Sequence, residues 1–327
     1  MNSRTSAVWH SVRESIVVVL AVGLMMPAMA AAPMVMRASP GYFRVMVGDF
    51  ELTALYDGGG EIDSKLLHAQ PEDVQSLVRK ELEDPEHIRG AVVGFLVNTG
   101  PKLILVDAGT GGHWGGPTLG KLVSNLKLSG YRPEQVDLVL LTHLHADHVG
   151  GIYTAAGRRA FPNAVVRVAR NDSDFWLSTE VAKQAPKEAQ EFFQIARNAA
   201  APYRSAGKWK TLSGSEEIVP GVRGHPIPGH TPGHTGYEFT SKGQTLLVWG
   251  DVVHVPAVQL PRPDIGIDYD IDGPSAIKAR EQLFDELAAK GTLIAGAHMQ
   301  FPSLGRLRKA GAGYAWVPVL YRDLQSP

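Results

Sequence analysis

The chain has 327 residues, of which 44% are hydrophobic and 20% are charged, and its formal net charge at pH 7 is −1. This composition is that of an ordinary globular protein with a sizeable core, and the near-neutral charge gives no reason to expect a nucleic-acid partner. The sequence contains no cysteine, which excludes disulfides and thiolate metal ligands.

The first 32 residues have the order of a secretory signal. Arg4 and Arg13 precede an apolar stretch over 16–26, and small residues at 28–32 supply an A-x-A cleavage pattern. The alternative is a membrane anchor, but the apolar stretch is short for a span and a cleavage pattern follows it. We therefore expect 1–32 to be a removable signal peptide of the general export type. The mature protein would be periplasmic or secreted, with no stable membrane span.

Hydrophobic periodicity predicts strands and helices in both halves of the remaining chain. In chain order, we predict strands at 42–47 and 50–56, a helix over 71–83, strands at 91–97 and 103–106, a helix over 119–128, strands at 138–141 and 165–169, helices over 172–178 and 187–200, strands at 237–240 and 245–249, a helix over 275–289 and a strand at 292–295. No composition shift separates the two halves. We therefore predict one α/β domain over 33–327, with two facing sheets covered by helices.

Some boundaries and loops can also be predicted. Glycines at 58–60 are expected to end the second strand, and Leu82 is expected on the apolar face of the first helix. The segment 110–116 is a glycine-rich loop. The segment 256–273 has no period, and structureless loops of this length are usually functional.

The densest group of metal-ligating residues follows the apolar run 138–141. His143 and His145 are alternate residues just past a predicted strand, so both can point the same way, and Asp147 and His148 extend the group into a turn. A segment this short is too cramped to close one tetrahedral site. It can instead supply two ligands to each of two adjacent metal ions.

The other ligands must then come from elsewhere in the chain. His230, Asp251 and His298 are the candidates, each at the end of a predicted strand. Imidazole and carboxylate together suit zinc, with manganese, cobalt and iron as alternatives. We therefore expect two divalent metal ions per chain, most readily Zn²⁺.

Four motifs, THLHADH, PGHTPGH, WGD and GAH, occur in an order that resembles the metallo-β-lactamase-fold hydrolase superfamily. The resemblance implies an αββα sandwich of two mixed β-sheets flanked by helices, with the metals between the sheet edges. It also implies ligand roles. The first metal would be bound by His143, His145 and His230, the second by Asp147, His148 and His298, and both by a bridging Asp251.

The same resemblance places other residues around the metals. His234 would sit behind His230, and Asp107 and Thr142 would lie behind the ligands, where Asp107 could orient a histidine. The alternative for Asp107 is a strand-end cap of the following turn. A hydroxide shared by the two metals would attack the substrate, with Asp147 or Asp251 shuttling a proton.

Longer segments, among them GYFRVMVGDFELTALYDG, FPNAVVR and DFWLS, resemble the methyl parathion hydrolase subgroup. That subgroup contains organophosphate triesterases and related lactone and aryl-ester hydrolases, which are secreted and commonly dimeric. The resemblance implies a homodimer and an aromatic leaving-group pocket lined by Trp114, Trp176 and Phe193. Alternatively, Trp176 and Phe193 are core residues of their helices.

One position bears on the substrate. His254 lies three residues after Asp251, where the superfamily's lactonases carry a tyrosine and its phosphotriesterase-type members an apolar residue. A histidine there could donate a hydrogen bond to a developing oxyanion, or it could be a loop residue facing water. Ile267 and Tyr269 would add a bulky wall that favours flat substrates over tetrahedral phosphotriesters.

We therefore predict a hydrolase of lactones and aryl esters with weaker organophosphate triesterase activity. Its partner would be a small-molecule ester, lactone or phosphotriester. The alternatives are a primary organophosphate triesterase, a thiolesterase of the glyoxalase II type and a non-catalytic metal-binding protein.

Overall fold

The structure is a computed structural model that describes residues 32, 34–36, 38–322 and 324. The chain divides into two units, 1–38 and 39–327, and the fold reported below is that of the second. Except for Ala32, the predicted signal peptide lies outside the described residues. Within the described part of the chain, no helix combines the length and the apolar character needed to cross a membrane.

The described chain forms two seven-stranded sheets. The strands of the first sheet, which neighbour one another in sequence order, are β1 (Tyr42–Val47), β2 (Phe50–Glu61), β3 (Arg89–Asn98), β4 (Leu103–Val106), β5 (Leu138–Leu141), β6 (Val165–Ala169) and β7 (Trp209–Leu212). Its first four strands pair antiparallel and β4 to β7 pair parallel, so the sheet is mixed.

The second sheet has the order β14-β13-β12-β11-β10-β9-β8. Its strands are β8 (Glu217–Val219), β9 (Val222–Pro226), β10 (Thr235–Ser241), β11 (Gln244–Val248), β12 (Leu293–Ala295), β13 (Leu304–Ala310) and β14 (Gly313–Pro318). All its pairs are antiparallel except β11 with β12, so this sheet is also mixed.

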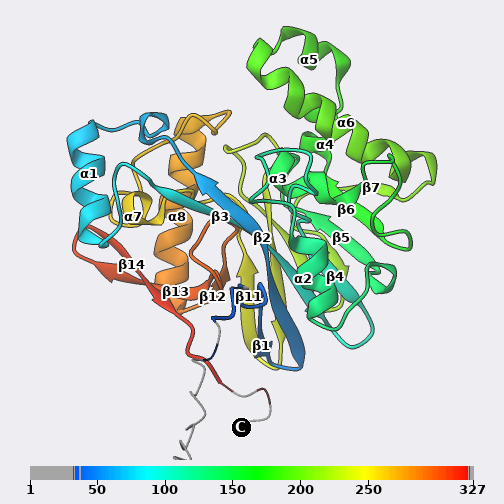
Figure 1. The fold of residues 1–327 in the computed structure, drawn as a ribbon, viewed down its shortest axis with the longest axis horizontal. Helices are drawn as coiled ribbons and strands as arrows, with labels where there is room; N and C mark the ends of the chain where they lie inside the picture. Colours follow the sequence, from blue (N-terminus) through cyan, green and yellow to red (C-terminus); the bar gives the residue numbers. More distant parts are fainter. Residues whose placement is uncertain (1–31, 33, 37, 323, 325–327) are drawn as a thin grey trace, which may run out of the picture. The chain divides into compact units, whose positions relative to one another are not determined.

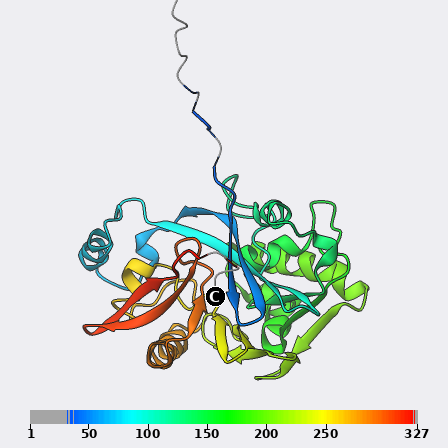
Figure 2. The same cartoon turned by 90° about the horizontal axis from the view of Figure 1, so that it is seen from below.

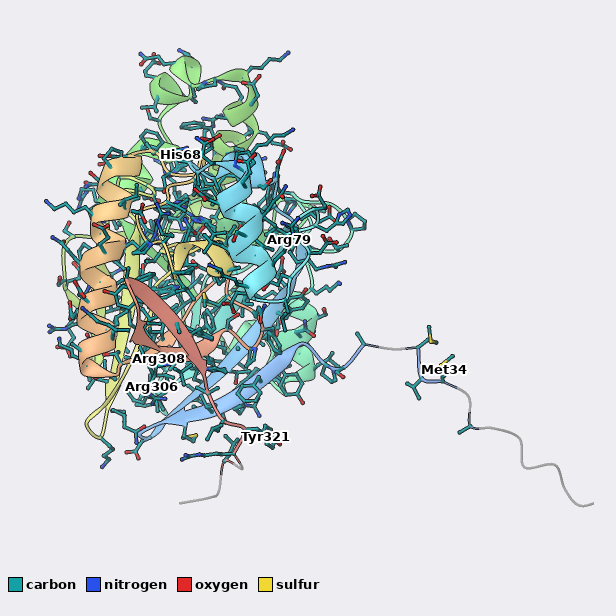
Figure 3. All side chains as sticks on the ribbon, turned by 90° about the vertical axis from the view of Figure 1, so that its left-hand side faces the viewer. Met34, His68, Arg79, Arg306, Arg308 and Tyr321 are labelled. Carbon is teal, nitrogen blue, oxygen red and sulfur yellow. The ribbon has the colours of Figure 1, made fainter. Side chains whose placement is uncertain are left out.

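Helices flank both sheets (Figures 1 and 2). The α-helices are α1 (Pro71–Lys80), α2 (Leu122–Leu128), α3 (Ala146–Val149), α4 (Arg170–Trp176), α5 (Thr179–Gln184), α6 (Gln190–Ser205), α7 (Pro256–Gln259) and α8 (Gly273–Lys290). The short 3₁₀ helices are η1 (Ser64–Leu66), η2 (Pro133–Gln135), η3 (Gly150–Ile152) and η4 (Lys187–Ala189). In Figure 3, α1 runs between His68, near its start, and Arg79, near its end.

Alternating side chains of the strands explain the layers. In β5, Leu140 packs between the two sheets, whereas Val139 and Leu141 pack against the helices that cover the first sheet. On the second sheet, Trp249 and Phe284 belong to the layer between the strands and α8. These layers confirm the predicted αββα sandwich.

Two boundary predictions were wrong. Strand β2 continues through 58–60 to Glu61, with a register shift at Asp57. A Cβ at Gly58 would lie 2.1 Å from the carbonyl oxygen of Thr118, so this glycine permits close approach of a loop and does not end the strand. Helix α1 ends at Lys80, and Leu82, with a positive φ, is 95% exposed.

Other elements were missed or misjudged. The sequence did not predict α5, the strands β7, β8 and β9, or the C-terminal hairpin of β13 and β14. Pro202 lies inside α6, in its last turn, and the helix continues to Ser205. The loop after β11 contains the short helix α7. Most of these elements are too short, or too interrupted by Gly and Pro, to show a clear period.

Candidate metal centre

Four ligand-bearing segments meet where strands of the two sheets end. His143 and His145 follow β5, and α3 carries Asp147 and His148 in its single turn. The remaining three residues come from the second sheet: His230 lies between β9 and β10, Asp251 follows β11, and His298 follows β12. The structure thus brings together all seven predicted ligand residues, and they fall into two adjacent groups that share no residue.

The first group consists of His143, His145, His230 and Asp251. The Nε2 atom of His230 lies 3.2 Å from Nε2 of His143 and 3.0 Å from Nδ1 of His145. The Oδ2 atom of Asp251 lies 3.4 Å from Nε2 of His230. Three imidazole nitrogens and one carboxylate oxygen therefore converge on a single point.

The second group consists of Asp147, His148 and His298. Oδ2 of Asp147 lies 3.5 Å from Nε2 of His148 and 3.6 Å from Nε2 of His298. The two oxygens of Asp251 face this group as well, with Oδ1 3.1 Å from Nε2 of His148 and Oδ2 3.0 Å from Nε2 of His298. Asp251 thus touches both groups, as a bridging carboxylate must.

Outer partners orient the imidazoles. Nδ1 of His148 lies 2.9 Å from Asp107 and Nδ1 of His298 lies 2.7 Å from the Ala91 carbonyl. The hydroxyl of Thr142 donates to Asp107 and can accept from Nδ1 of His143 at 3.0 Å. An acceptor beside the ring nitrogen that faces away from the cluster keeps the proton on that nitrogen. The ring nitrogen that faces the cluster then has a lone pair for a metal.

Unpaired inner atoms agree with a metal site. Nε2 of His148 and Oδ1 of Asp251 are buried and make no hydrogen bond to any described residue. The ligand atoms of each group lie within 4.8 Å of one another. Such a set of imidazoles and carboxylates fits zinc or another first-row divalent ion.

In the metal-free protein, burial and nearby carboxylates give the histidines different protonation states. Burial lowers the pKa of His143 and His145 well below 6.5, so both are neutral. Burial also opposes the charge on His148 and His230, but carboxylates outweigh it. They raise the pKa of His148 well above 6.5 and that of His230 to about 9. A metal must therefore displace protons from the second pair.

His234 and Asp107 lie behind the ligands, where the sequence placed them. Nδ1 of His234 lies 3.0 Å from the Ile227 carbonyl, and its Nε2 accepts from the backbone N–H of Asp251 at 3.0 Å. Both nitrogens are therefore occupied, and His234 positions the Asp251 backbone. Asp107 accepts from both the backbone and the hydroxyl of Thr142.

His254 is turned into the cluster, so the alternative of a water-facing loop residue was wrong. Its side chain is 3% exposed, and its Nε2 lies 3.2 Å from Oδ2 of Asp251. Its ring stacks on that of His298 at 5.3 Å. Asp251, His254 and His298 form a third group with metal-ligand spacing. Tyr269, 39% exposed, has its ring 5.6 Å from that of His254.

Aromatic side chains flank the first ligand group. Trp176 is 4% exposed and is a core residue of its helix, as the alternative interpretation held, although its ring meets that of His145 edge-on at 5.1 Å. Trp114 is half-buried and lies 5.9 Å from Phe192, whose ring is 6.4 Å from that of His145. Phe192, which the sequence did not single out, therefore belongs to the aromatic wall.

Two predicted pocket residues are core residues instead. Phe193 is 2% exposed and packs behind Trp176 at 4.7 Å, because consecutive helical residues point about 100° apart. Ile267 is fully buried in a core cluster with Val74, and its backbone pairs with that of Leu67 in an isolated bridge. The predictions that Phe193 and Ile267 contact substrate were wrong.

Sequence reasoning missed a carboxylate that ties two ligand loops together. Asp172, on α4, is fully buried. Its Oδ2 accepts from the Leu144 N–H at 3.0 Å, and its Oδ1 accepts from the Thr231 hydroxyl at 2.6 Å and the Gly233 N–H at 2.7 Å. Its place just past a predicted strand was the only sequence signal. Asp270 was missed as well, and its Oδ1 lies 2.8 Å from Nδ1 of His230.

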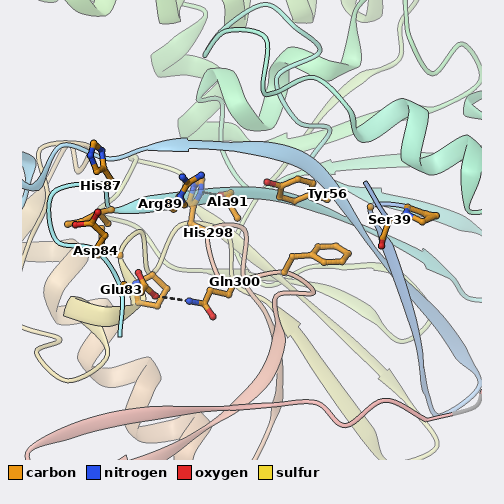
Figure 4. Close-up of a pocket in the computed structure, with 16 residues that line it drawn as sticks. Ser39, Tyr56, Glu83, Asp84, His87, Arg89, Ala91, His298 and Gln300 are labelled. Carbon is orange, nitrogen blue, oxygen red and sulfur yellow. Dashed lines mark hydrogen bonds between the residues drawn. The ribbon is translucent and has the colours of Figure 1, made fainter. Parts of the chain in front are cut away.

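A cavity of about 640 Å³ borders His298. Tyr56, Arg89 and Ala91 are among its lining residues (Figure 4). Glu83 and Gln300, which also line it, are joined by a hydrogen bond of 2.6 Å. The cavity therefore shares one wall with the second ligand group.

Comparisons with known proteins agree with this geometry. The model of the metallo-beta-lactamase superfamily matches residues 88–298. The crystal structure of the hydrolase AbOPH, described as in the beta lactamase superfamily, is 37% identical. It superposes with a TM-score of 0.83 over 88% of this chain and 100% of AbOPH. The dizinc quorum-quenching lactonase AidC shares the fold, with a TM-score of 0.80 and 24% identity over 86% of this chain and 99% of AidC.

A curated relative matches a shorter stretch. An N-acyl homoserine lactonase from Bacillus sp is 32% identical over 129 residues, which are 39% of this chain. The match spans 43% of the length of that relative.

Proposed function

The chain belongs to the metallo-beta-lactamase superfamily, and from this premise we propose that it is a metal-dependent hydrolase of lactones and aryl esters with weaker organophosphate triesterase activity. The observation that carries the proposal is Asp251, whose two oxygens face both ligand groups. We propose two divalent ions, Zn²⁺ first. Their ligands would be His143, His145, Asp147, His148, His230, Asp251 and His298.

The chain's own groups suit hydrolysis. When bound, divalent ions at such a site lower the pKa of a water molecule and polarise a carbonyl oxygen. Asp147, with a side chain 15% exposed, is the ligand carboxylate open to substrate and can accept or deliver a proton there. Burial lowers the pKa of His254 to about 4, so at neutral pH its ring is neutral and carries one N–H. If the proton is on Nε2, which lies 3.2 Å from Oδ2 of Asp251, that N–H could turn from the carboxylate to a substrate oxygen on which negative charge develops beside it.

The shape of the surroundings supports flat substrates. Trp114 and Phe192 are partly buried and form an aromatic wall next to His145, with the buried Trp176 behind it, and such partly exposed rings can stack on planar aryl groups. Tyr269 lies next to His254. A planar ester or lactone fits between these two walls more readily than a tetrahedral phosphotriester. The lactonases among the relatives support the same ranking.

A kinetic panel tests the proposal. The zinc-loaded protein is assayed with dihydrocoumarin, an aryl acetate, a thioester and methyl paraoxon, and kcat/KM is compared. We expect the lactone and the aryl ester to be preferred, and a clear preference for the phosphotriester or the thioester would contradict the ranking. Asp251→Asn should abolish turnover of every substrate. Metal analysis should give two zinc ions per chain.

We also propose export and dimerisation. The order of charged, apolar and small residues in 1–32 supports a removable signal peptide, and the resemblance to the methyl parathion hydrolase subgroup supports a homodimer. Amino-terminal sequencing of the protein from the periplasmic fraction tests the first. Light scattering of the purified protein tests the second, and a monomer mass would contradict it.

A further inference from the structure

We infer that Asp270 and Arg280 act together as positioning residues that set the geometry of both ligand groups and of the Tyr269 wall. The inference rests on the proposed metal-dependent hydrolysis, and it assigns a role to a buried ion pair that touches neither substrate nor metal. The two charges lie on different segments: Asp270 is in the loop between α7 and α8, and Arg280 is in α8.

Arg280 connects three backbone segments. Its side chain is 1% exposed, and its Nε donates to the Val252 carbonyl at 2.7 Å. Its Nη1 donates to the carbonyls of Pro263 at 2.9 Å and Ile265 at 2.8 Å. Because Val252 directly follows Asp251, the guanidinium fixes the backbone of the bridging carboxylate relative to the loop.

Asp270 connects the same loop to the first ligand group. Its Oδ1 lies 2.8 Å from Nδ1 of His230, whose Nε2 faces His143 and His145. Its Oδ2 makes no hydrogen bond within the described chain and lies 3.7 Å from Nη2 of Arg280. The carboxylate therefore balances the guanidinium charge while it orients His230.

The loop also carries a wall of the proposed pocket. Tyr269 precedes Asp270, and its ring lies beside that of His254. On the other side of Asp270, the N–H of Ile271 donates to the His230 carbonyl at 3.0 Å. The position of Tyr269 therefore depends on the same contacts of Asp270 and Ile271 that hold His230. A change in the ion pair should alter metal binding and substrate binding together.

The chemistry of the two groups makes this role specific. A lysine can keep the positive charge, but its single ammonium cannot reproduce three hydrogen bonds in the planar arrangement of a guanidinium. An asparagine at 270 keeps the shape and one acceptor for His230 but leaves the buried Arg280 without its countercharge. The two substitutions thus separate geometry from charge.

The experiment uses the full chain loaded with zinc or cobalt. Asp270→Asn and Arg280→Lys are compared with Arg262→Lys, which alters an exposed pair with Asp264 on the same loop. Changes to the groups that support metal ligands weaken metal affinity by about 10- to 100-fold. Asp270→Asn removes the charge beside His230, and Arg280→Lys removes hydrogen bonds that hold Val252 and the loop. We expect this loss for both buried variants, by competition with a chromophoric chelator, together with a changed visible spectrum of bound cobalt. The Arg262→Lys protein should match the wild type in both.

Substrate kinetics complete the test. Both buried variants should raise KM for an aryl ester by more than they lower kcat, because the Tyr269 wall moves. A folded Asp270→Asn protein with unchanged zinc affinity and cobalt spectrum would overturn the inference, even if Arg280→Lys does not fold. The metal measurements need no substrate, so an incorrect substrate assignment would appear only as a failure of the kinetic panel.

Discussion

Asp172→Asn offers a sharp test of how the ligand loops are held. Asp172 joins the loop after β5 to the loop between β9 and β10 through hydrogen bonds to Leu144, Thr231 and Gly233. Asparagine keeps the shape and one oxygen acceptor. It removes the charge and turns an NH₂ group toward the Leu144 N–H, which leaves a buried donor unpaired at a cost of about 1–3 kcal/mol.

The charge itself has a cost that asparagine avoids. Burial raises the pKa of Asp172 from 3.8 to about 6, although its hydrogen bonds lower it. Because the folded pKa is the higher one, the stability from this group is fully present below pH 3.8 and is lost as the pH rises through 6. The full loss is about 3 kcal/mol, of which about 2 kcal/mol falls between pH 4 and pH 7. The variant does not incur this loss.

The variant should therefore gain on the wild type as the pH rises. In the metal-free protein, the difference in unfolding free energy should shift by about 2 kcal/mol in favour of Asp172→Asn between pH 4 and pH 7. Denaturant unfolding at the two pH values measures it, and Asp174→Asn, which changes an exposed carboxylate on the same helix, is the control variant. An equal difference at both pH values would refute the reasoning.

The same substitution, Asp172→Asn, should weaken metal binding even though it gains stability relative to the wild type at higher pH. The ionised Asp172 bonds the chain neighbours of His143, His145 and His230 rather than those ligands themselves. Its loss should therefore weaken zinc affinity by about tenfold, the low end of the range for groups that support metal ligands. A chelator competition assay at pH 7 measures this. Unchanged affinity would show that the two loops do not depend on Asp172.

Three further predictions concern the ligands and the pocket. Because the pKa of His230 is about 9 in the metal-free protein, zinc binding to the first ligand group should release one proton, and the apparent affinity of that group should rise about tenfold per pH unit from pH 6 to pH 8. Calorimetry in buffers of different ionisation enthalpy counts the protons, including any released from His148 in the second group. Phe192→Ala should raise KM for an aryl ester with little change in melting temperature, whereas Phe193→Ala should cost about 3–5 kcal/mol of stability, which denaturant unfolding measures. His254→Leu should shift kcat/KM toward methyl paraoxon, and an unchanged substrate ranking would exclude His254 as a specificity residue.

The first ligands that the sequence predicts lie close together in the chain, whereas the site residues that it does not predict act on partners far away in the chain. The candidate ligands after β5 fall within six positions, and imidazole and carboxylate groups can be recognised as metal ligands from the residue types alone. Asp172 acts on Leu144 and Thr231, which are 28 and 59 residues away. Asp270 acts on His230 across 40 residues. Such partners share no local pattern, so only the folded chain shows that they belong to the site.

The strands divide in a similar way. Apolar runs such as β4 and β5 are buried on both faces and are legible as strands. In the hairpin of β13 and β14, β13 mixes buried residues with exposed arginines and a lysine, and β14 is short and buried only at its start, so neither strand shows a clear period. Strand β2 was predicted to end early because its glycines resemble a turn, whereas Gly58 admits a neighbouring loop and the strand continues.

The sequence by itself determined the two helix-flanked sheets and the candidate metal ligands, because side-chain chemistry and hydrophobic period are properties of nearby residues. Tertiary packing alone decided which side chains surround the ligands. Because of packing, the ring of His254 lies in the cluster and Phe192 rather than Phe193 contributes to the aromatic wall. Packing also buries Ile267 in a core cluster with Val74. The direction of a side chain depends on the rotation of its helix or the path of its loop, and packing against distant segments sets both.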